Sequence, residues 1–434
     1  MKKRYDSYKP SGIDWIGDIP SHWTLSKIKF IGEIRGRIGF RGYTTADLVS
    51  EGEGALTIGG KHISNNVIDL TDPEYISWDK YYESPEIMVS KGDIVIAQRG
   101  TLKRTAYISK NIGPATINPS LVLLTNIKIN PKYLHSYLCS NATTEFIDYL
   151  NTATAVPMIS QNQIENIRII EPPLAEQEAI AAWLDEKCGE IDAAIAKVDR
   201  EIELIDELKQ SEISRVVTRG LNPDTPLRPS GIDWIGDIPE HWTKCRLKFI
   251  GSARNGLTYS PSDVKDSGKL VIRSSNIQDS KLNYDDCVFV ANYPETLSVN
   301  SGDTIICSRN GSINLIGKSV FIEDDMDVTF GAFMMRFRPY EHPKYSHYLL
   351  SIAISRYKGL FATTTINQLT ADSLGKMEAV MPPYMEQVQI ADYLDKKCAA
   401  IDGLKAKLIK KRETLTELRQ SIISEVVTGK RKVI

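Results

Sequence analysis

Apolar residues recur at alternating steps of four and three positions in two long stretches of the chain, 172–218 and 382–428. Each stretch opens with a pair of prolines and contains no further proline, so each predicts one uninterrupted helix. A stripe of this spacing with charged flanks is typical of a coiled coil. The stripe consists of Leu184, Cys188, Ile191, Ile195, Val198, Ile202 and Ile205 in the first stretch, and of Leu394, Cys398, Ile401, Leu404 or Lys405, Leu408, Leu415 and Leu418 in the second.

The two predicted helices carry opposite net charge. Residues 174–220 hold 6 basic and 12 acidic side chains, whereas residues 384–430 hold 9 basic and 7 acidic ones. Opposite charge on two stripes of matching length favours pairing of the helices with each other. Because the chain between them is long enough for a globular domain, we expect an antiparallel coiled coil. The alternative is that each helix packs separately on its own domain.

The regions that precede these helices, 24–171 and 243–381, have a different pattern. Short runs rich in Ile, Val, Thr and Tyr are broken at close intervals by Gly, Asn, Asp and Pro. This pattern predicts β-rich domains. We therefore expect an α+β fold in which two β-rich domains are joined by two long helices.

The chain consists of two copies of one frame. PSGIDWIGDIPSHWT, from Pro10, and PSGIDWIGDIPEHWT, from Pro229, agree at 14 of 15 positions. The two predicted helices align without gaps and share 24 of 47 residues, whereas the β-rich regions match only faintly. The entry segment and the helix are thus repeated, whereas the β-rich region between them has diverged. This pattern predicts two domains in a pseudo-two-fold arrangement. The expected segments are a first domain at 1–171 with entry segment 10–24, a helical spacer at 172–220, a second domain at 221–381 with entry segment 229–243, and a second spacer at 382–434.

Composition is that of a globular protein kept in a reducing compartment. The chain has 434 residues, 42% of them hydrophobic and 25% charged, which predicts two or three domains. No apolar run follows the basic start MKKRYDSYKP, and runs such as IVIA (94–97) are too short to cross a bilayer. Six cysteines without a C-x-x-C pair indicate reduced thiols and no zinc site. We therefore expect a cytoplasmic protein without a membrane contact.

Three short motifs resemble catalytic sites but lack necessary residues. GSINLIGKS (311–319) places five residues between its glycines, where a phosphate-binding loop needs four. MPPY (381–384) begins with Met, where the motif of amino-methyltransferases needs a polar residue. DEK (185–187) and DKK (395–397) lie on the predicted helices, away from any strand, and the six histidines show no ligand spacing. We therefore predict neither a catalytic nor a metal site.

Basic and amide side chains recur on glycine-punctuated loops at corresponding points of the two β-rich regions. Arg and Asn are the residue types that read guanine and adenine edges in a major groove, so these loops are the candidate DNA-binding sites. The candidates are Arg35, Arg37, Arg41, Lys61, Arg99, Lys103 and Arg104 in the first region, and Arg254, Asn255, Arg273, Asn276, Arg309 and Asn310 in the second.

The entry segment SGIDWIGDIPxHW and the motif PP-x-x-EQ-x-x-I-A-x-x-L-D-x-K, each present twice, resemble the specificity subunit of type I restriction–modification enzymes. The resemblance covers essentially the whole chain. It implies two target recognition domains, each reading one half of a split double-stranded DNA sequence, and helical regions that space these domains and bind methyltransferase subunits, two of them in our expectation. Restriction subunits that translocate DNA and cut it would complete the complex. Catalysis and its cofactors (S-adenosylmethionine, ATP and Mg²⁺) would then belong to the partner subunits, with none bound by this chain.

The residues alone leave two other functions open: a stand-alone DNA methyltransferase, and a coiled-coil scaffold with two modules that bind something other than DNA.

The balance of basic and acidic residues limits the hypothesis that the chain binds DNA. Net charge is −2, and the β-rich regions hold 15 basic and 15 acidic residues, and 16 and 14, respectively. Because phosphate neutralisation supplies much of the affinity for DNA, we expect weak DNA binding by the isolated chain.

Overall fold

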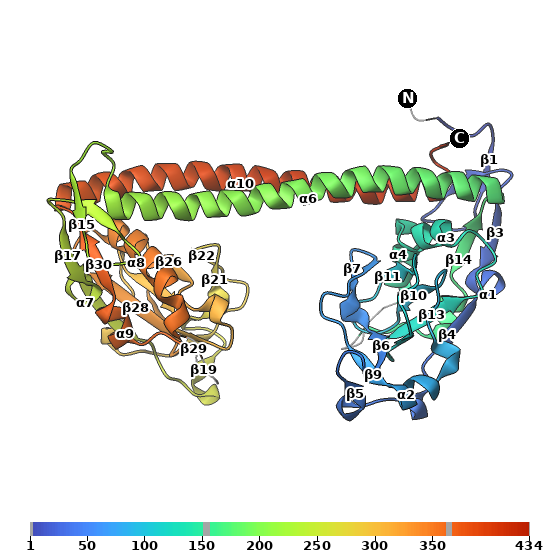
Figure 1. Cartoon of the computed structure of the whole chain (residues 1–434), viewed down its shortest axis with the longest axis horizontal. Helices are drawn as coiled ribbons and strands as arrows, with labels where there is room; N and C mark the ends of the chain where they lie inside the picture. Colours follow the sequence, from blue (N-terminus) through green and yellow to red (C-terminus); the bar gives the residue numbers. More distant parts are fainter. Residues whose placement is uncertain (1–2, 151–156, 362–366, 434) are drawn as a thin grey trace. The chain divides into compact units, whose positions relative to one another are not determined.

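The structure is a computed structural model that describes residues 3–150, 157–361 and 367–433. The chain forms two compact units (Figure 1). The first combines Met1–Asp199 with Lys410–Ile434, and the second consists of Arg200–Ile409. Each unit therefore holds one β-rich domain together with part of each long helix. The described residues contain no helix that is both long and apolar enough to span a membrane.

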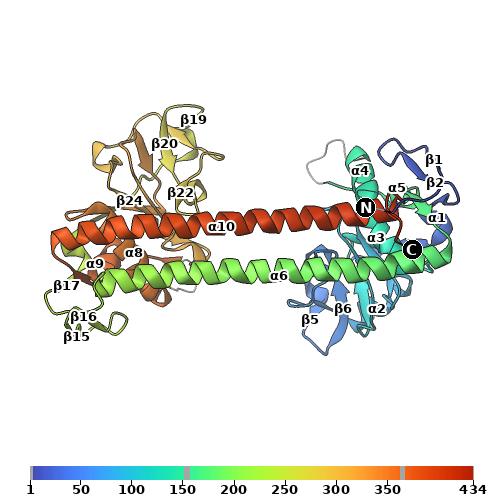
Figure 2. The ribbon, with the colours of Figure 1, turned by 90° about the horizontal axis from the view of Figure 1, so that it is seen from above.

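The two predicted helices are α6 (Leu174–Arg219) and α10 (Tyr384–Val427). Both begin directly after a pair of prolines, where the missing N–H of proline costs nothing. Within each unit the two helices lie side by side, as Figure 2 shows. Four ion pairs join them, and the residue number rises on one helix as it falls on the other, so the predicted antiparallel pairing is confirmed. The pairs are Arg412–Asp199 and Arg419–Asp192 in the first unit, and Lys405–Asp206 and Lys209–Asp402 in the second, at 2.6 to 2.8 Å.

Most of the predicted apolar stripe lies between the helices or against the domains. Ile191, Val198 and Ile401 are buried, whereas Leu404 and Leu418 are exposed. At the position where the pattern allows Leu404 or Lys405, Lys405 is half-buried and bonded to Asp206 on the facing helix. Lys405 thus takes the stripe position next to Leu404, and Leu404 faces solvent.

The β-rich domain of the first unit contains two four-stranded sheets. All neighbouring strands in them are antiparallel except β12 and β6, which are parallel. The first sheet has the order β11 (Thr105–Tyr107), β10 (Ile94–Ala97), β13 (Leu121–Thr125), β4 (Glu33–Gly36), and the second β12 (Ala115–Ile117), β6 (Gly54–Ile58), β9 (Tyr75–Ser77), β5 (Leu48–Val49).

The domain of the second unit repeats this topology, strand for strand, despite its divergent sequence. Its single parallel pair within these sheets, β20 with β27, corresponds to β6 with β12. The orders are β18 (Gly251–Asn255), β28 (Met334–Pro339), β24 (Thr304–Cys307), β26 (Ser319–Phe321), and β19 (Val264–Lys265), β23 (Phe289–Val290), β20 (Lys269–Ile272), β27 (Val328–Phe330). The predicted α+β fold with two equivalent β-rich domains is confirmed.

A two-stranded sheet links each domain to its long helix. In the first unit β3 (Thr24–Lys27) pairs with β14 (Arg168–Glu171), directly before the prolines that open α6. In the second, β17 (Thr243–Arg246) pairs with β30 (Glu378–Met381) before α10. The chain therefore enters and leaves each domain at adjacent points.

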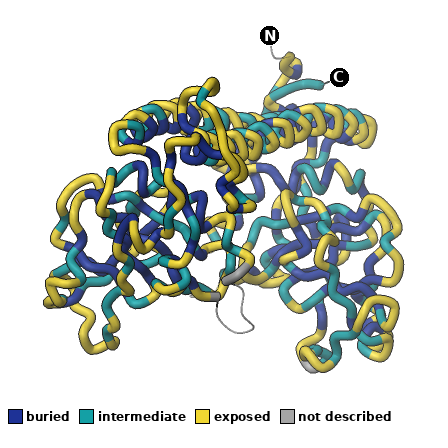
Figure 3. The backbone as a smooth tube through the Cα atoms, turned by 60° about the vertical axis from the view of Figure 1, so that its left-hand side comes forward, coloured by how far each residue is buried: buried dark blue, intermediate teal, exposed yellow. Residues whose placement is uncertain are grey.

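The main core of each unit includes residues from both long helices. In the first unit, Leu184 near the start of α6 and Val426 and Val427 at the end of α10 belong to the same buried cluster. In the second, the corresponding residues are Leu394 of α10 and Val216 and Val217 of α6. Figure 3 shows the buried residues gathered inside each unit and exposed residues along the helices. Each domain is thus closed by the start of its own helix and the end of the other one.

A glutamate ties each entry segment to the helix that follows the domain. Oε1 of Glu176 lies 2.6 Å from Nε2 of His22, and Trp23 donates from Nε1 to Oε2 at 3.0 Å. The equivalents in the second unit are Glu386, His241 and Trp242, at 2.5 and 2.9 Å. The two duplicated segments, His-Trp and the Glu of the EQ motif, therefore bind each other. We call this contact the Glu–His–Trp latch.

The same tryptophan contacts the end of the other long helix. Just beyond α10, Gly429 has a φ of +74°, and a Cβ there would come within 2.2 Å of Pro20 and 3.0 Å of the buried Trp23 ring. Just beyond α6, Gly220 has the same φ, and its Cβ would lie 3.2 Å from Trp242. Glycine suits both positions because the conformation is left-handed and the ring leaves no room for a side chain. Each tryptophan consequently joins both helices to its domain.

We predict that Glu176→Ala lowers the stability of the first unit by about 1.5–3 kcal/mol, the usual contribution of hydrogen bonds to a charged group. Glu178→Ala, on the exposed side of the same turn, is the matched control and should change stability by less than about 0.5 kcal/mol. Hydrogen exchange measured by mass spectrometry follows each unit separately. Equal losses for the two variants would contradict a specific role for the latch.

The latch also predicts a pH dependence. Burial alone would raise the pKa of Glu176, but hydrogen bonds from His22 and Trp23 outweigh it and hold the pKa below its usual 4.5. A carboxyl group whose pKa is lower in the folded state stabilises the fold above its unfolded pKa and loses this effect as pH falls through the folded pKa. The stability difference between wild type and Glu176→Ala should therefore be full at pH 7 and shrink below about pH 4.

Candidate nucleic-acid interface

Three loops of the first unit meet at one end of its sheets: 59–62 after β6, 98–104 after β10 and 118–120 after β12. The backbone N–H groups of Gln98 and Arg99 both donate to the carbonyl of Ser120, at 2.9 and 3.2 Å. Nη1 of Arg104 donates to the carbonyl of Gly60 at 3.0 Å. A fourth segment joins them, because the N–H of Ile159 donates to the carbonyl of Gln98 at 2.9 Å. We call these segments the loop cluster of the first unit.

The second unit builds the same loop cluster from different residues. The N–H groups of Ser308 and Arg309 both donate to the carbonyl of Phe333, at 2.9 and 3.1 Å. Lys318 takes the place of Arg104 and donates from Nζ to the carbonyl of Ser274 at 3.3 Å. The N–H of Leu369 donates to the carbonyl of Ser308 at 2.7 Å, as Ile159 does to Gln98. Most of these bonds are between backbone groups, so the cluster keeps its shape while its side chains differ.

The predicted residues of the loop after β10 lie in the first loop cluster. Arg99 is exposed at the tip of this loop. Lys103, in a left-handed conformation with φ +70°, pairs with Asp148 at 2.6 Å. Arg104 is half-buried and braces the neighbouring loop through Gly60. Of these three, Arg99 is the side chain best placed to reach a ligand.

Lys61, in the loop after β6, is partly exposed and paired with two carboxylates. Its Nζ lies 2.9 Å from both Asp72 and Glu74. Ion pairs between exposed groups contribute little, so a phosphate can displace these partners at small cost.

The three arginines of the glycine-rich stretch 35–41 have separate environments. Arg35 bonds to Glu33 at 2.5 Å, and Arg41 lies 3.5 Å from Glu86. Arg37 is only 8% exposed, and burial lowers the pKa of its guanidinium below the usual value. It donates to the carbonyls of Ile117 (3.3 Å) and Arg41 (3.4 Å) and to Oγ1 of Thr116 (3.2 Å). These bonds hold the stretch against β12, so a base contact by Arg37 would require breaking them.

In the second unit Arg254 and Asn255 end β18, and the half-buried Arg309 and Asn310 form β25 (Arg309–Asn310) just after β24. Arg254 and Asn255 are exposed at the end of β18, and the N–H of Gly256 donates to the carbonyl of Met334 in the adjacent strand. The guanidinium carbon of Arg309 lies 5.4 Å from the centre of the Phe333 ring, which is 56% exposed. Oδ1 of the neighbouring Asn310 accepts from the N–H of Ser312 at 3.0 Å. A guanidinium held over an exposed ring is pre-organised for a planar partner.

The remaining two candidates, Arg273 and Asn276, support the loop after β20. Arg273 pairs with Asp286 at 2.7 Å. Asn276 is fully buried: its Oδ1 accepts from the N–H of Arg273 at 3.0 Å, and its Nδ2 donates to the carbonyls of Asn283 and Asp286. His62 occupies the same place in the first unit and accepts from the N–H of Gly59 at 2.9 Å. Both residues hold the loop in shape.

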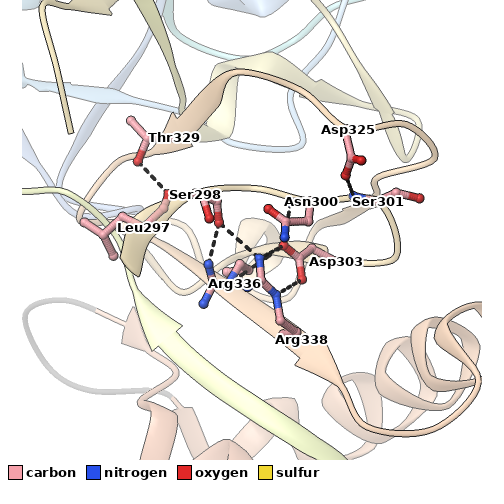
Figure 4. Close-up of polar contacts among 9 residues, drawn as sticks. All are labelled: Leu297, Ser298, Asn300, Ser301, Asp303, Asp325, Thr329, Arg336 and Arg338. Atoms are coloured by element: carbon pink, nitrogen blue, oxygen red, sulfur yellow. Dashed lines mark hydrogen bonds and ion pairs between the residues drawn. The ribbon is translucent and has the colours of Figure 1, made fainter. Parts of the chain in front are cut away.

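Sequence reasoning missed a buried polar cluster in the second unit, drawn in Figure 4. Asp303 is buried and accepts from Nε and Nη2 of Arg338 at 2.8 and 2.7 Å, and from the N–H of Asn300 at 2.8 Å. The buried Arg336 donates to the carbonyl of Ser298. The alternation of β28, MMRFRP, places both arginines on one face of the strand, which is the signal that could have revealed them.

Sequence reasoning missed Phe333 for another reason: a lone aromatic residue in a loop has no periodicity to mark it.

Among the described residues, no group of three His, Cys, Asp or Glu side chains is arranged to hold a metal ion. The two domains share one backbone arrangement, and each presents one loop cluster whose side chains differ from those of the other. This arrangement is that of a recognition protein with two modules.

Comparison with known proteins assigns the class of these modules. Residues 20–203 and 239–411 match the family model described as the type I restriction modification DNA specificity domain. The two matches cover far more than half of the chain, one in each repeat. The chain belongs to this family, and the resemblance to specificity subunits is confirmed.

Individual relatives are distant. The chain is 28% identical to the type I restriction enzyme StySPI specificity subunit of Salmonella potsdam over 204 residues, 45% of this chain and 44% of that protein. The EcoKI specificity subunit of Escherichia coli K12 is 29% identical over 206 residues, again 44% of its length. These two matches thus span less than half of each relative. The putative MjaX specificity subunit of Methanocaldococcus jannaschii is 23% identical over 96% of both chains.

A solved structure shares the fold. A chain from work on complex assembly and conformational transition of the type I restriction–modification system superposes with a TM-score of 0.66. The alignment covers 95% of this chain and 99% of that one, at 16% sequence identity.

The buried Arg37 and the exposed Arg99 of the first unit should differ in their effect on stability. Arg37→Met leaves the Ile117 carbonyl and the Thr116 hydroxyl without their donor, and we predict a loss of about 2–4 kcal/mol in the first unit. Arg99→Met should change stability by less than about 0.5 kcal/mol, because Arg99 is exposed. Urea unfolding followed by hydrogen exchange measures both. A neutral Arg37→Met would mean that Arg37 does not brace the loop.

Proposed function

We propose that this chain is the sequence-reading subunit of a type I restriction–modification enzyme. Each loop cluster reads one half of a bipartite, asymmetric DNA target, and partner subunits then methylate adenine or cut the DNA. The observation that carries the proposal is that two loop clusters keep the same backbone bonds while their side chains differ. A constant scaffold with variable side chains suits two half-sites that share B-form geometry and differ in bases.

Base contacts are assigned to the exposed Arg99 in the first unit, to the exposed Arg254 and Asn255 in the second, and to the half-buried Arg309, which lies over the exposed Phe333 ring. Arg and Asn in such positions make the bidentate contacts to guanine and adenine that discriminate bases. Lys61 is better suited to a phosphate, which positions the protein without reading sequence. Because the domains are close to neutral, partner subunits supply most of the nonspecific affinity for DNA.

The chemical steps are assigned to the partners. In this proposal the chain has no catalytic role and binds no cofactor, while methyltransferase and restriction subunits use S-adenosylmethionine, ATP and Mg²⁺. The long helices offer a docking surface for two methyltransferase subunits, because they expose large apolar residues on their free faces. They include Leu204, Leu208, Leu404 and Ile409 in the second unit, and Leu174 and Leu418 in the first.

Exchange of one domain tests the division of the target between the units. We predict that replacing residues 33–167 with the same region of another specificity subunit changes one half of the methylated sequence and leaves the other intact. These limits keep the entry segment, β3, β14 and both helices. Mapping methylated adenines genome-wide in cells with each chain measures the outcome. A change in both halves would contradict one half-site per unit.

A stand-alone methyltransferase would behave differently in a simpler measurement. Such an enzyme binds S-adenosylmethionine by itself and methylates DNA without a partner. The proposal requires that calorimetric titration of the isolated chain with S-adenosylmethionine gives no binding, and that methylation needs an added methyltransferase subunit. A scaffold that does not bind DNA would leave the methylated sequence unchanged after the domain exchange.

Single substitutions test the reading residues. Arg309→Ala should weaken binding to DNA that carries the correct second half-site by about 5- to 100-fold, the value of one bidentate base contact. Arg99→Ala, the residue at the same place in the first unit, is the reciprocal control and should affect the other half-site. Competition binding of the assembled methyltransferase to duplexes with one altered half-site separates the two. An equal loss of affinity for unrelated DNA would mean that Arg309 contacts phosphate.

A further inference from the structure

Each unit contains a one-turn helix that exposes a lysine and a phenylalanine, in the same order in both units. The turns are α1 (Ile28–Ile31) and α7 (Leu247–Ile250), within the sequences KIKFIG and RLKFIG. In both, the outer two residues are buried and the Lys-Phe pair between them is exposed. Phe30 is 60% exposed and Phe249 is 68% exposed. One exposed phenylalanine is ordinary on a protein surface, but the same one in both repeats indicates a shared use.

The packing of the turn forces the phenylalanine outward. Ile28 and Ile31 belong to the main core of the first unit, and Leu247 and Ile250 to that of the second. The following glycine lies so close to the neighbouring strand that a Cβ at Gly32 would come within 2.7 Å of Leu124, and one at Gly251 within 2.5 Å of Phe337. Since the turn is fixed at both ends, the two middle side chains must face solvent.

A lysine side chain lies beside each phenylalanine ring. Nζ of Lys29 lies 5.3 Å from the centre of the Phe30 ring, and Nζ of Lys248 lies 5.0 Å from that of Phe249. Lys128 donates from Nζ to the carbonyl of Phe30 at 3.2 Å, adding a second lysine in the first unit.

In the second unit these groups line an open groove of about 410 Å³, and its one acidic residue, Glu378, is paired with Lys244 at 2.9 Å. The groove is lined by Lys244, Cys245, Arg246, Lys248, Phe249 and Glu378. An apolar ring within a positive rim fits an apolar pocket rimmed by carboxylates.

The turns lie at the opposite end of the sheet from the loop clusters. In the first unit β13 runs from Leu121, next to the loop cluster, to Thr125, which pairs with Glu33 beside α1. In the second, β28 runs from Met334, next to the loop cluster, to Pro339, which pairs with Gly251 beside α7. At about 3.4 Å per residue the separation is about 14–17 Å along the strand. DNA held at the loop clusters therefore meets a different end of each domain.

We propose that Lys29–Phe30 and Lys248–Phe249, together the Lys–Phe patches, are two equivalent docking sites, each for one methyltransferase subunit. This inference rests on the proposed function and names a second contact of that partner besides the long helices. Loop clusters that differ between the units suit two different half-sites, whereas patches that are the same suit two copies of one protein. The partner presents an apolar pocket with an acidic rim to each patch.

The test uses the full chain and the purified methyltransferase subunit of the same restriction–modification system. The variants are Phe30→Ala, Phe249→Ala, the double variant, and the charge reversal Lys29→Glu with Lys248→Glu. Tyr82→Ala with Tyr284→Ala is the matched control, because these tyrosines are exposed on the same two domains away from the turns. Sedimentation measures how many methyltransferase subunits bind and how tightly, and binding of duplex target by the isolated chain is measured in parallel.

We expect each single variant to weaken one of two binding events by about 10- to 100-fold, as truncation of an interface anchor does, and the double variant to weaken both. The charge reversal should act in the same direction, the tyrosine control should bind as wild type does, and DNA binding by the isolated chain should not change. Normal methyltransferase binding by the double variant overturns the inference. Loss of DNA binding instead assigns the patches to DNA and also overturns it. Failure of the wild-type chain to bind any methyltransferase subunit contradicts the proposed function itself.

Discussion

The Glu–His–Trp latch is the contact on which the arrangement of each unit depends. A carboxylate at the first turn of a long helix accepts hydrogen bonds from the entry segment, and the tryptophan that donates one of them packs on the glycine ending the other helix. A buried tyrosine adds a second link, since the hydroxyl of Tyr133 lies 2.8 Å from the carbonyl of Ile170 and 3.4 Å from that of Val427. Tyr345 does the same in the second unit. The entry segment, the start of one long helix and the end of the other meet at this point. Because all three must fit together, the two repeats are most alike there.

A rigid frame separates stability from specificity. The loop clusters are held mainly by backbone bonds, and Asn276, which supports the loop after β20, is buried. Arg37, which holds the stretch 35–41 against β12, is buried as well. The side chains at the tips, such as Arg99 and Phe333, contribute little to this bracing. Substitutions at the tips can therefore change what is recognised at small cost in folding free energy, because exposed positions are tolerant. This division suits a protein whose target sequence must be able to change.

The long helices and the repeated frame could be predicted because their signals are periodic or duplicated. An apolar stripe such as Ile191 to Val198 predicts a coiled coil, and the opposite net charges of the two helices favour pairing with each other. The globular domain between them predicts the antiparallel direction. Burial in the loops could not be predicted. Arg37 and Arg41 lie four residues apart in the same glycine-rich stretch, yet the first is buried and the second half-buried, because only the tertiary fold brings the Ile117 carbonyl to Arg37. The outward position of Phe30 likewise depends on the strand that crowds Gly32.

The exchange of helix ends between the repeats has a consequence for how such a chain can arise. A polypeptide with only one repeat would have a domain that lacks the helix end represented here by Val426 and Val427, and a helix end without a domain to cover. Two identical polypeptides could complete each other by exchanging their helix ends, as in domain-swapped dimers. Under the proposed function, their two-fold symmetry would restrict them to palindromic DNA sites. Fusion of two copies into one polypeptide keeps every packing contact and frees each loop cluster to mutate independently, so asymmetric recognition needs a gene duplication but no new fold.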